Sequence, residues 1–149
     1  MRILIQRVKK AKVASEGAVL GEIGIGLLLL IGIAKDDTEK EAETLAAKTV
    51  HLRIMPDTEN RMNRSVLDVG GEILVVSQFT LFADTSAGRR PSFTDSAGPE
   101  KAEKLYEFFI GVLRKLGVKK VAAGRFGAYM DIELTNDGPV TILIDSQRV

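Results

Sequence analysis

The stretch IGLLLLIGIA, from Ile25 to Ala34, is the longest apolar run of the chain. It has about half of the ~20 residues that a helix needs to span a bilayer, so it does not predict a membrane span. Short apolar runs bounded by turn residues are typical of strands buried in a sheet. We therefore expect a buried strand here, with the neighbouring segments forming the rest of the sheet.

Two helices are predicted after this strand. Thr38, followed three residues later by Glu41, has the form of a capping box, and apolar residues then recur at helical spacing until about His51. Pro99 suits the first turn of a second helix, whose apolar stripe ends before Gly117. The phenylalanines of that stripe are expected in the core.

Further segments have the character of strands, and together they define the fold class. They are Arg2 to Val13, Val19 to Ile23, Glu72 to Gln78, Val118 to Ala122, Ala128 to Leu134 and Val140 to Asp145. We predict a single α/β domain over residues 1–149, with a curved, barrel-like, mostly antiparallel or mixed sheet covered by two main helices. A loop or irregular hairpin is expected from Arg53 to Asn63, and a long surface loop from Phe82 to Ala97. Loops of the latter length are more often functional than not.

Composition excludes several catalytic classes. The chain has no cysteine and one histidine, His51, so a thiolate nucleophile, a sulfur-ligated zinc and a two-histidine metal motif are excluded within one chain. His51 is expected to be solvated or to stabilise the helix dipole. The lack of cysteine and of an apolar secretory leader leads us to expect a cytoplasmic protein.

Charge limits any contact with nucleic acid to local patches, because the formal net charge is only +1. The candidate patches are Lys9-Lys10 with Lys12, Arg89-Arg90, and Lys119-Lys120 with Arg125. The alternative for each patch is a set of solvated charges balanced by nearby acids.

The candidate nucleophiles are Ser77 and Thr80, where a predicted buried strand meets the long polar loop. A hydroxyl needs a general base to attack an ester at neutral pH. No histidine or lysine lies in this stretch, and Asp84 is the nearest acid. The alternative is a strand end whose hydroxyls bond the backbone.

The segment Asn136-Asp137-Gly138-Pro139 admits two interpretations. Asp-Gly between two strands indicates a hairpin turn, although the following proline makes a two-residue turn less favourable. The other interpretation is a cis peptide bond before Pro139, which about 5% of such bonds adopt. Local sequence alone favours the turn.

Four separated blocks of the chain resemble the signature segments of the D-aminoacyl-tRNA deacylases, also called the D-tyrosyl-tRNA deacylase family. They are Ser77 to Thr80, Gly88 to Phe93, Gly124 to Ala128 and Asn136 to Thr141. Gln6 to Val8 and Leu67 to Gly71 match as well, so the resemblance follows the whole chain in order.

The resemblance implies a homodimeric hydrolase that releases D-amino acids from tRNA at a site on the dimer interface. One subunit would supply the pocket residues Ser77, Gln78, Phe79 and Thr80. The other subunit would supply Gly138 and Pro139, joined by a cis bond. Phe126 matches a phenylalanine near the bound 3′-terminal adenosine of the tRNA. Arg7 matches an arginine thought to hold the carbonyls of the glycine and the proline.

The mechanism that the resemblance implies needs no metal and no cofactor. The 2′-hydroxyl beside the aminoacyl ester would help to activate or position water. A backbone amide near Phe79 or Thr80 would stabilise the oxyanion, a contribution of about 10²–10³ in rate. An older proposal for the family makes Thr80 a covalent nucleophile, and the sequence leaves both open.

Chirality would be sensed at the α-carbon, because contacts to a variable side chain discriminate by only about 1–3 kcal/mol per methylene. The carbonyls of a cis Gly138-Pro139 unit would clash with an L side chain. Glycine has no side chain to exclude, so we expect hydrolysis of glycyl-tRNA too.

Two other functions remain as alternatives. One is a non-catalytic dimeric RNA- or DNA-binding module, against which stand the low net charge and the lack of an aromatic-plus-basic stacking motif. The other is a related editing enzyme that removes an L-amino acid from the wrong tRNA, although the glycine-proline context resembles the D-specific group.

Overall fold

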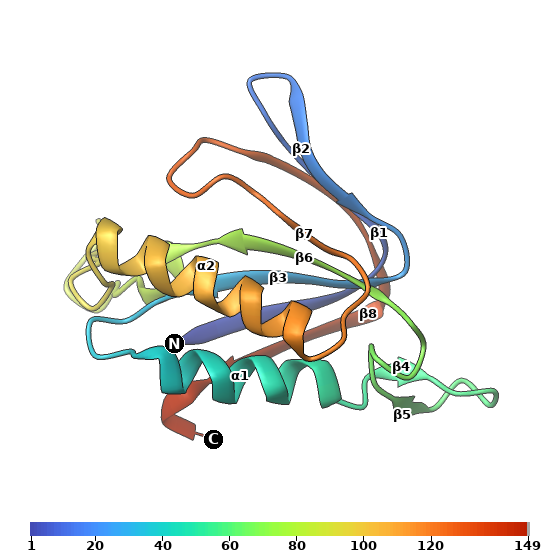
Figure 1. Cartoon of the computed structure of the whole chain (residues 1–149). Helices are drawn as coiled ribbons and strands as arrows, with labels where there is room; N and C mark the ends of the chain where they lie inside the picture. The colour runs from blue at the N-terminus through green and yellow to red at the C-terminus, as the bar shows by residue number, and fades with distance from the viewer. Residues whose placement is uncertain (149) are drawn as a thin grey trace.

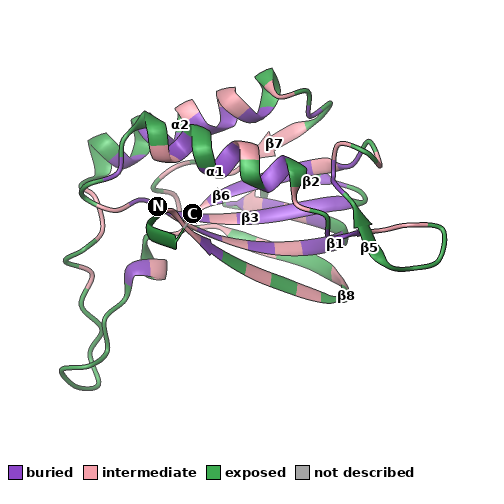
Figure 2. Cartoon of the chain, turned by 90° about the horizontal axis from the view of Figure 1, so that it is seen from below, coloured by how far each residue is buried: buried purple, intermediate pink, exposed green. Residues whose placement is uncertain are grey.

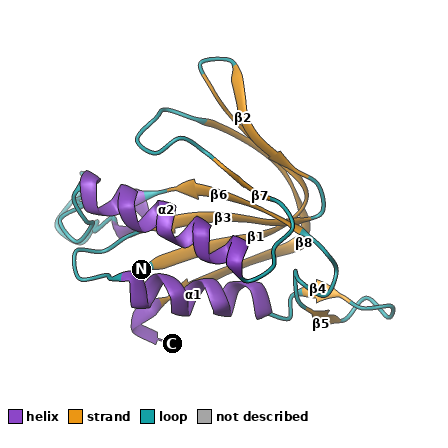
Figure 3. Ribbon diagram, in the orientation of Figure 1, coloured by secondary structure: helices purple, strands orange, loops and turns teal. Residues whose placement is uncertain are grey.

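The computed structural model describes residues 1–148 and contains a strongly curved mixed sheet with two helices packed against one face (Figures 1 and 3). The main sheet comprises β1 (Arg2–Ser15), β2 (Ala18–Ile23), β3 (Gly26–Gly32), β6 (Glu72–Ser77), β7 (Val121–Ala123) and β8 (Asp131–Asp145). The helices are α1 (Glu39–His51) and α2 (Pro99–Lys115). The predicted single-domain α/β class with two main helices is confirmed.

The order of strands is β2-β1-β3-β6-β7, with β8 paired to β1. β3 is antiparallel to β1 and parallel to β6, so the predicted buried strand lies in the middle of the sheet. The two ends of this order approach each other, because a side-chain carbon built at Gly21 of β2 would lie 3.1 Å from the Cβ of Ala122 in β7. The sheet is therefore mixed and nearly closed, as a barrel is.

Buried side chains form one layer on each face of the sheet. Figure 2 shows buried residues along β1, β3 and β6. Leu27 and Leu29 belong to the layer under the helices, whereas Leu28 belongs to the layer on the other face. This alternation follows from the two-residue period of a strand. Phe109 of α2 is fully buried in the first layer, which confirms the predicted core role of the α2 stripe.

The start of α1 forms as the sequence predicts. The Thr38 hydroxyl accepts a hydrogen bond from the Lys40 amide at 3.3 Å, and the Glu41 carboxylate accepts one from the Thr38 amide at 2.8 Å. These bonds satisfy donors that a helix leaves free at its first turn. His51 lies exposed at the last residue of α1, which agrees with its expected solvation.

The predicted pair of strands at the C-terminal end is wrong, because β8 is one strand of 15 residues. Its partner β1 is nearly as long and pairs with it from Arg2 to Ala14. Gly138 and Pro139 lie where the register shifts between Gln6 and Val8, so they form an irregularity within the strand and not a hairpin turn. Pairing along a long neighbour has outweighed the local turn signal.

Smaller elements complete the chain. β4 (Met55–Pro56) and β5 (Met62–Arg64) form the expected irregular hairpin, and a 3₁₀ helix, η1 (Phe79–Phe82), precedes the long loop. A second 3₁₀ helix, η2 (Ser146–Arg148), ends the described chain. The strand predicted from Val118 begins only at Val121, because the Val118 amide donates to the Leu113 carbonyl and closes the end of α2. Within residues 1–148, no helix is long and apolar enough to cross a membrane.

Candidate active site

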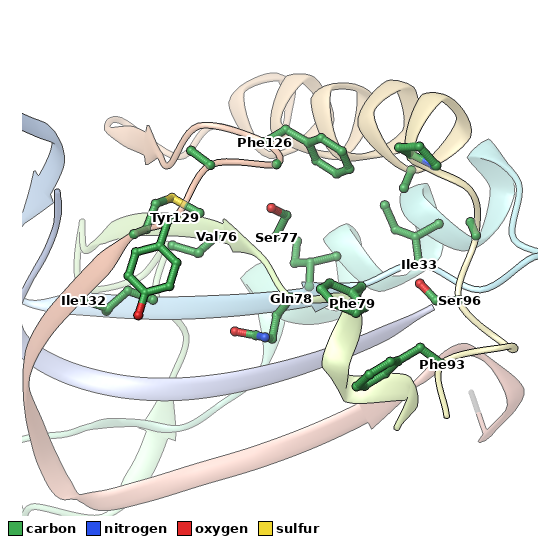
Figure 4. A pocket seen from close by; sticks show the side chains of 17 residues that line it. Ile33, Val76, Ser77, Gln78, Phe79, Phe93, Ser96, Phe126, Tyr129 and Ile132 are labelled. Atoms are coloured by element: carbon green, nitrogen blue, oxygen red, sulfur yellow. The ribbon is translucent and has the colours of Figure 1, made fainter. Parts of the chain in front are cut away.

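A cavity of about 520 Å³ opens beside the carboxyl end of β6 (Figure 4). Its walls are apolar and aromatic, with a few hydroxyl and amide groups, and none of its lining residues is charged. The lining residues are Ile31, Ile33, Val76, Ser77, Gln78, Phe79, Phe93, Ser96, Ala97, Pro99, Ala102, Phe126, Gly127, Ala128, Tyr129, Met130 and Ile132. An apolar pocket with few polar groups is the usual form of a small-molecule site.

Ser77, Gln78 and Phe79 of the predicted segment form one wall of this cavity, and Thr80 does not line it. β6 ends at Ser77, and the Gln78 amide donates to the Ile31 carbonyl at 2.7 Å before the chain turns into η1. Phe79 is 56% exposed although it is a large aromatic residue, so its ring is available to a ligand. Thr80 is exposed beside the cavity and accepts a hydrogen bond from the Gln78 side-chain amide.

Two backbone donors of this segment are free. The amides of Phe79 and Thr80 have no acceptor among residues 1–148, because they begin η1 and precede its first internal bond. The Leu81 amide, by contrast, donates to the Gln78 carbonyl at 3.2 Å. Two adjacent free amides at the edge of a cavity can stabilise a developing negative charge.

A buried tyrosine holds the opposite wall. The Tyr106 hydroxyl of α2 lies 2.8 Å from the Val75 carbonyl oxygen and 3.3 Å from the Gly124 carbonyl oxygen, and it donates to them. Burial raises the pKa of the Tyr106 phenol, so the group stays protonated as a donor. Its ring centroid is 6.0 Å from that of Phe126. Phe126 is thereby positioned in the wall, where Figure 4 shows its ring above Ser77.

Two aromatic residues of the site were not singled out from the sequence. Phe93 packs edge-on against Phe79, with ring centroids 5.0 Å apart, and its only sequence signal was its place in the Gly88 to Phe93 block. Tyr129 is 91% exposed at the other end of the cavity, and its carbonyl accepts a bond from the Ser15 hydroxyl at 2.8 Å. The sequence placed Tyr129 inside the predicted strand Ala128 to Leu134, but β8 begins only at Asp131, so Tyr129 lies in the segment before the strand.

The remaining predicted residues form a second group around Arg7, which is 9% exposed. Its guanidinium donates to the Asp137 carbonyl at 3.1 Å and to the Ile54 carbonyl at 2.6 Å, and it pairs with the Asp137 carboxylate at 3.1 Å. The expected acceptors were the carbonyls of Gly138 and Pro139, so the arginine holds the residue just before them. The bond between Gly138 and Pro139 is cis.

Within one chain, the two groups lie apart on the sheet, because Arg7 and Gly138 are in the middle of β1 and β8 whereas Ser77 ends β6. Arg7 pairs with Leu27, which pairs with Ile73, whereas Ser77 lies four residues further along β6. At about 3.3 Å per residue, Arg7 is roughly 13 Å from Ser77 along the direction of the strands. It also lies two strands across from Ser77, with about 4.8 Å between neighbouring strands. Gly138, beside Arg7 on β8, is one strand further still.

The cavity contains no general base. Asp84, the nearest acid in sequence, has a pKa lowered by hydrogen bonds from Ser86, and it does not line the cavity. His51 lies on α1 and does not line the cavity either. Residues 1–148 contain no group of three histidine, cysteine or acidic residues arranged to hold a metal ion. Protein groups at this site can therefore bind and orient, and can donate hydrogen bonds.

The fold and the site define a small α/β protein with a nearly closed mixed sheet and an uncharged aromatic pocket beside free backbone amides. Residues 4–145 match the family described as D-Tyr-tRNA(Tyr) deacylase, and the chain belongs to this family.

Similar proteins span the whole chain. Proteins named D-aminoacyl-tRNA deacylase include one from Thermosipho melanesiensis, 54% identical over 100% of this chain and 99% of its own length. One from Roseiflexus sp. is 60% identical over 98% of this chain and 94% of its own length. A solved structure titled c-Myc DNA Unwinding Element Binding Protein is 39% identical, with a TM-score of 0.92 over 97% of this chain and 98% of that one. A probable eukaryotic D-amino acid tRNA deacylase, 17% identical over 96% of this chain and 97% of its own, has the same fold, with a TM-score of 0.85.

Proposed function

We propose that this protein hydrolyses the ester that joins a D-amino acid to the 3′-terminal adenosine of tRNA, and so releases free D-amino acid and tRNA. The observation that carries the proposal is full-length similarity at 54–60% identity to proteins named for this activity. The cavity supports it, because an uncharged aromatic-lined space suits a nucleoside and an aminoacyl ester. This activity would serve proofreading in translation.

The proposed site is shared between two subunits of a homodimer. The register supports this proposal, because Arg7 is offset from Ser77 of its own chain by four residues along the strands and by two strands across the sheet, and neither Arg7 nor Gly138 lines the cavity. Gly138 and Pro139 are exposed on β8, which pairs only with β1 within residues 1–148. The same strand exposes Leu134 and Leu143, at 40% and 57%. A second copy that covered β8 would bury these side chains and bring its own Gly138 and Pro139 to the cavity.

The proposed chemistry is direct attack of water on the ester carbonyl. The carbonyl carbon gains an oxygen from water, the ester bond to the ribose oxygen breaks, and that ribose oxygen takes a proton as it leaves. The free amides of Phe79 and Thr80 would stabilise the oxyanion between these steps. The 2′-hydroxyl of the same ribose would position the water or relay its proton, because the cavity offers no base.

Thr80 is assigned a positioning role and not a nucleophilic one. A threonine hydroxyl needs a neighbouring base to attack an ester. Its hydroxyl oxygen instead accepts a hydrogen bond from the Gln78 side chain, and no charged residue lines the cavity. The neutral amide of Gln78 cannot remove the proton.

Chirality would be sensed by the main chain of Gly138 and Pro139 from the partner. This segment is held on both sides, because the Asn136 side chain accepts from the Val140 amide at 2.9 Å and donates to Gln6. A rigid main-chain wall would exclude an L side chain at the α-carbon whatever its size. It would admit glycine, so glycyl-tRNA is a proposed second substrate.

One observation favours a second candidate function, a DNA- or RNA-binding module without catalysis. The solved structure with a TM-score of 0.92 is titled as a DNA-element binding protein. Incubation of the purified protein with matched D- and L-tyrosyl-tRNA separates the two functions. Release of D-tyrosine and not of L-tyrosine supports the deacylase, whereas binding of tRNA with no release of either supports the binding module. Release of L-tyrosine alone would indicate an L-specific editing enzyme.

A further inference from the structure

A basic arm next to the cavity has no role in the function proposed above. The arm, residues 83–92, follows η1 and projects from the body of the domain (Figure 2). Asp84 and Ser92 join its two sides by reciprocal backbone hydrogen bonds of 2.8 Å. Phe93, the next residue, packs on Phe79 in the cavity wall. The arm is therefore anchored at the cavity that would hold the ester.

Arg89 and Arg90 lie near the tip of this arm, and both are exposed. Neither makes an ion pair or a hydrogen bond with any residue from 1 to 148. Some other cations of the chain are partnered, such as Lys120 with the Glu72 carboxylate at 3.3 Å. Two adjacent free guanidinium groups concentrate positive charge in a protein whose net charge is only +1.

The cavity has the opposite character, since none of its lining residues is charged. It suits the terminal nucleoside and its ester, but it offers nothing to the phosphates that connect this nucleoside to the rest of the RNA. Those phosphates must leave through the mouth of the cavity. Arg90 is three residues before Phe93, so its Cα is within roughly 11 Å of the cavity wall along an extended chain. Guanidinium groups bind phosphate in a bidentate geometry that suits this position.

We propose that Arg89 and Arg90 bind the phosphates of the single-stranded RNA that leads into the cavity. The arm thus recognises the RNA chain, while the cavity recognises the terminal aminoacyl nucleoside. This assignment rests on the proposed deacylase function and adds to it the part of the substrate that each surface contacts. The contact is independent of base sequence, because it involves only the backbone of the RNA.

The test compares two substrates that differ in their phosphates. One is D-tyrosyl-tRNA, and the other is adenosine esterified with D-tyrosine, which has no phosphate. The variant R89A/R90A is compared with K119A/K120A, which removes the same charge at the opposite end of β6, where Val121 pairs with Ile73. The variant R89K/R90K keeps the charge without the bidentate geometry. Circular dichroism and melting curves establish that all of these variants fold.

The proposal predicts that R89A/R90A reduces kcat/KM for D-tyrosyl-tRNA and leaves kcat/KM for the adenosine ester unchanged. Two phosphate contacts to single-stranded RNA give a slope of about −1.4 when the logarithm of kcat/KM is plotted against the logarithm of the salt concentration. This slope corresponds to a loss of about sevenfold in kcat/KM between 50 and 200 mM salt. The wild type should lose about sevenfold more activity on the tRNA over this range than R89A/R90A does. K119A/K120A and R89K/R90K should keep the wild-type slope, because the first leaves the arm intact and the second keeps its charge. The kcat/KM of R89K/R90K for D-tyrosyl-tRNA should fall between those of the wild type and R89A/R90A, because lysine lacks the bidentate geometry.

Equal losses on both substrates, or parallel salt slopes for wild type and R89A/R90A, would overturn the proposal. An equal change of slope in K119A/K120A would also overturn it, because the effect would then belong to overall charge. The salt comparison needs only the tRNA substrate, so it decides the proposal whatever the rate on the adenosine ester. A wild-type protein inactive on both substrates would refute the deacylase function itself, which is a separate outcome.

Discussion

The proposed shared site predicts that two inactive variants restore activity to each other. Gly138→Ala alters the group around Arg7: the backbone φ of Gly138 is +127°, and an added Cβ would lie 3.0 Å from the Arg7 guanidinium and 2.8 Å from a Val140 methyl carbon. Side chains rarely adopt this φ, and the buried arginine cannot give way freely. Gln78→Ala alters the cavity wall of the other group.

The expected amount of restored activity follows from the symmetry of the dimer. Equal amounts of the two variants, unfolded and refolded together, give about half mixed dimers if pairing is random. Each mixed dimer has one site in which an intact Gln78 segment meets an intact Gly138 segment, and one site in which both are altered. The mixture should therefore regain about a quarter of the wild-type activity, since one of two sites is intact in half of the dimers.

The assay is release of D-tyrosine from D-tyrosyl-tRNA before and after co-refolding. The matched control mixes Gln78→Ala with Phe79→Ala, because every site in that mixed dimer has an altered wall and should stay inactive. Melting curves establish that each variant folds alone. No recovery with Gly138→Ala although mixed dimers form would show that the site lies within one chain. Recovery in the control pair would show that the regained activity does not depend on the Gly138 segment of the partner, and would also contradict the shared site.

Three further predictions concern single residues. Thr80→Ala should keep much of the activity while a substrate ending in 2′-deoxyadenosine is nearly inert in a single-turnover assay, and a trapped acyl-threonine would contradict this. Tyr106→Phe removes a buried hydrogen bond and should lower the free energy of unfolding by about 1 kcal/mol, which lowers Tm by about 2–4 °C. The same change should raise KM more than it lowers kcat, because Tyr106 positions the cavity wall. Unchanged Tm and KM would contradict this structural role. Burial raises the pKa of Asp145, but hydrogen bonds from the Gln147 amide and from Arg2, with the positive charge of Arg2, together outweigh burial and lower this pKa. Stability from this carboxylate should be present above pH 3.8, its ordinary pKa, and be lost as pH falls through the lowered value, so denaturation curves of wild type and Asp145→Asn should differ at pH 7 and converge in acid. A difference that persists unchanged in acid would contradict the assignment.

Local patterns predicted the elements whose signals act over a few residues. The capping box at Thr38, the apolar stripe of α2 and the apolar run of β3 each form as expected. Helix caps and helical periodicity involve neighbours three or four residues apart, so the sequence alone contains the interacting groups.

The strand β8 shows the limit of such patterns. Asp137-Gly138 favours a hairpin locally, but β1 offers a continuous partner from Arg2 to Ala14, and the chain instead continues as one strand. The hydrogen bond from Arg7 to the Asp137 carbonyl joins residues 130 positions apart, so no local sequence pattern contains both residues. Only the packed sheet decides such contacts, since their free energy depends on partners distant in sequence.

The site divides in the same way. The sequence marked the segment Ser77 to Thr80, Phe126, Arg7 and the Gly138-Pro139 pair through its resemblance to a known family, and it excluded thiolate and paired-histidine chemistry through composition. The tertiary structure decided that Ser77 to Phe79 and Phe126 line one uncharged cavity. It also decided that Arg7 and the Gly138-Pro139 pair lie apart from it, in the middle of β1 and β8. It also brought Phe93 and Tyr129 into the cavity and left two amides of η1 free. Cavities and free donors arise from how distant segments pack, so a one-dimensional pattern cannot specify them.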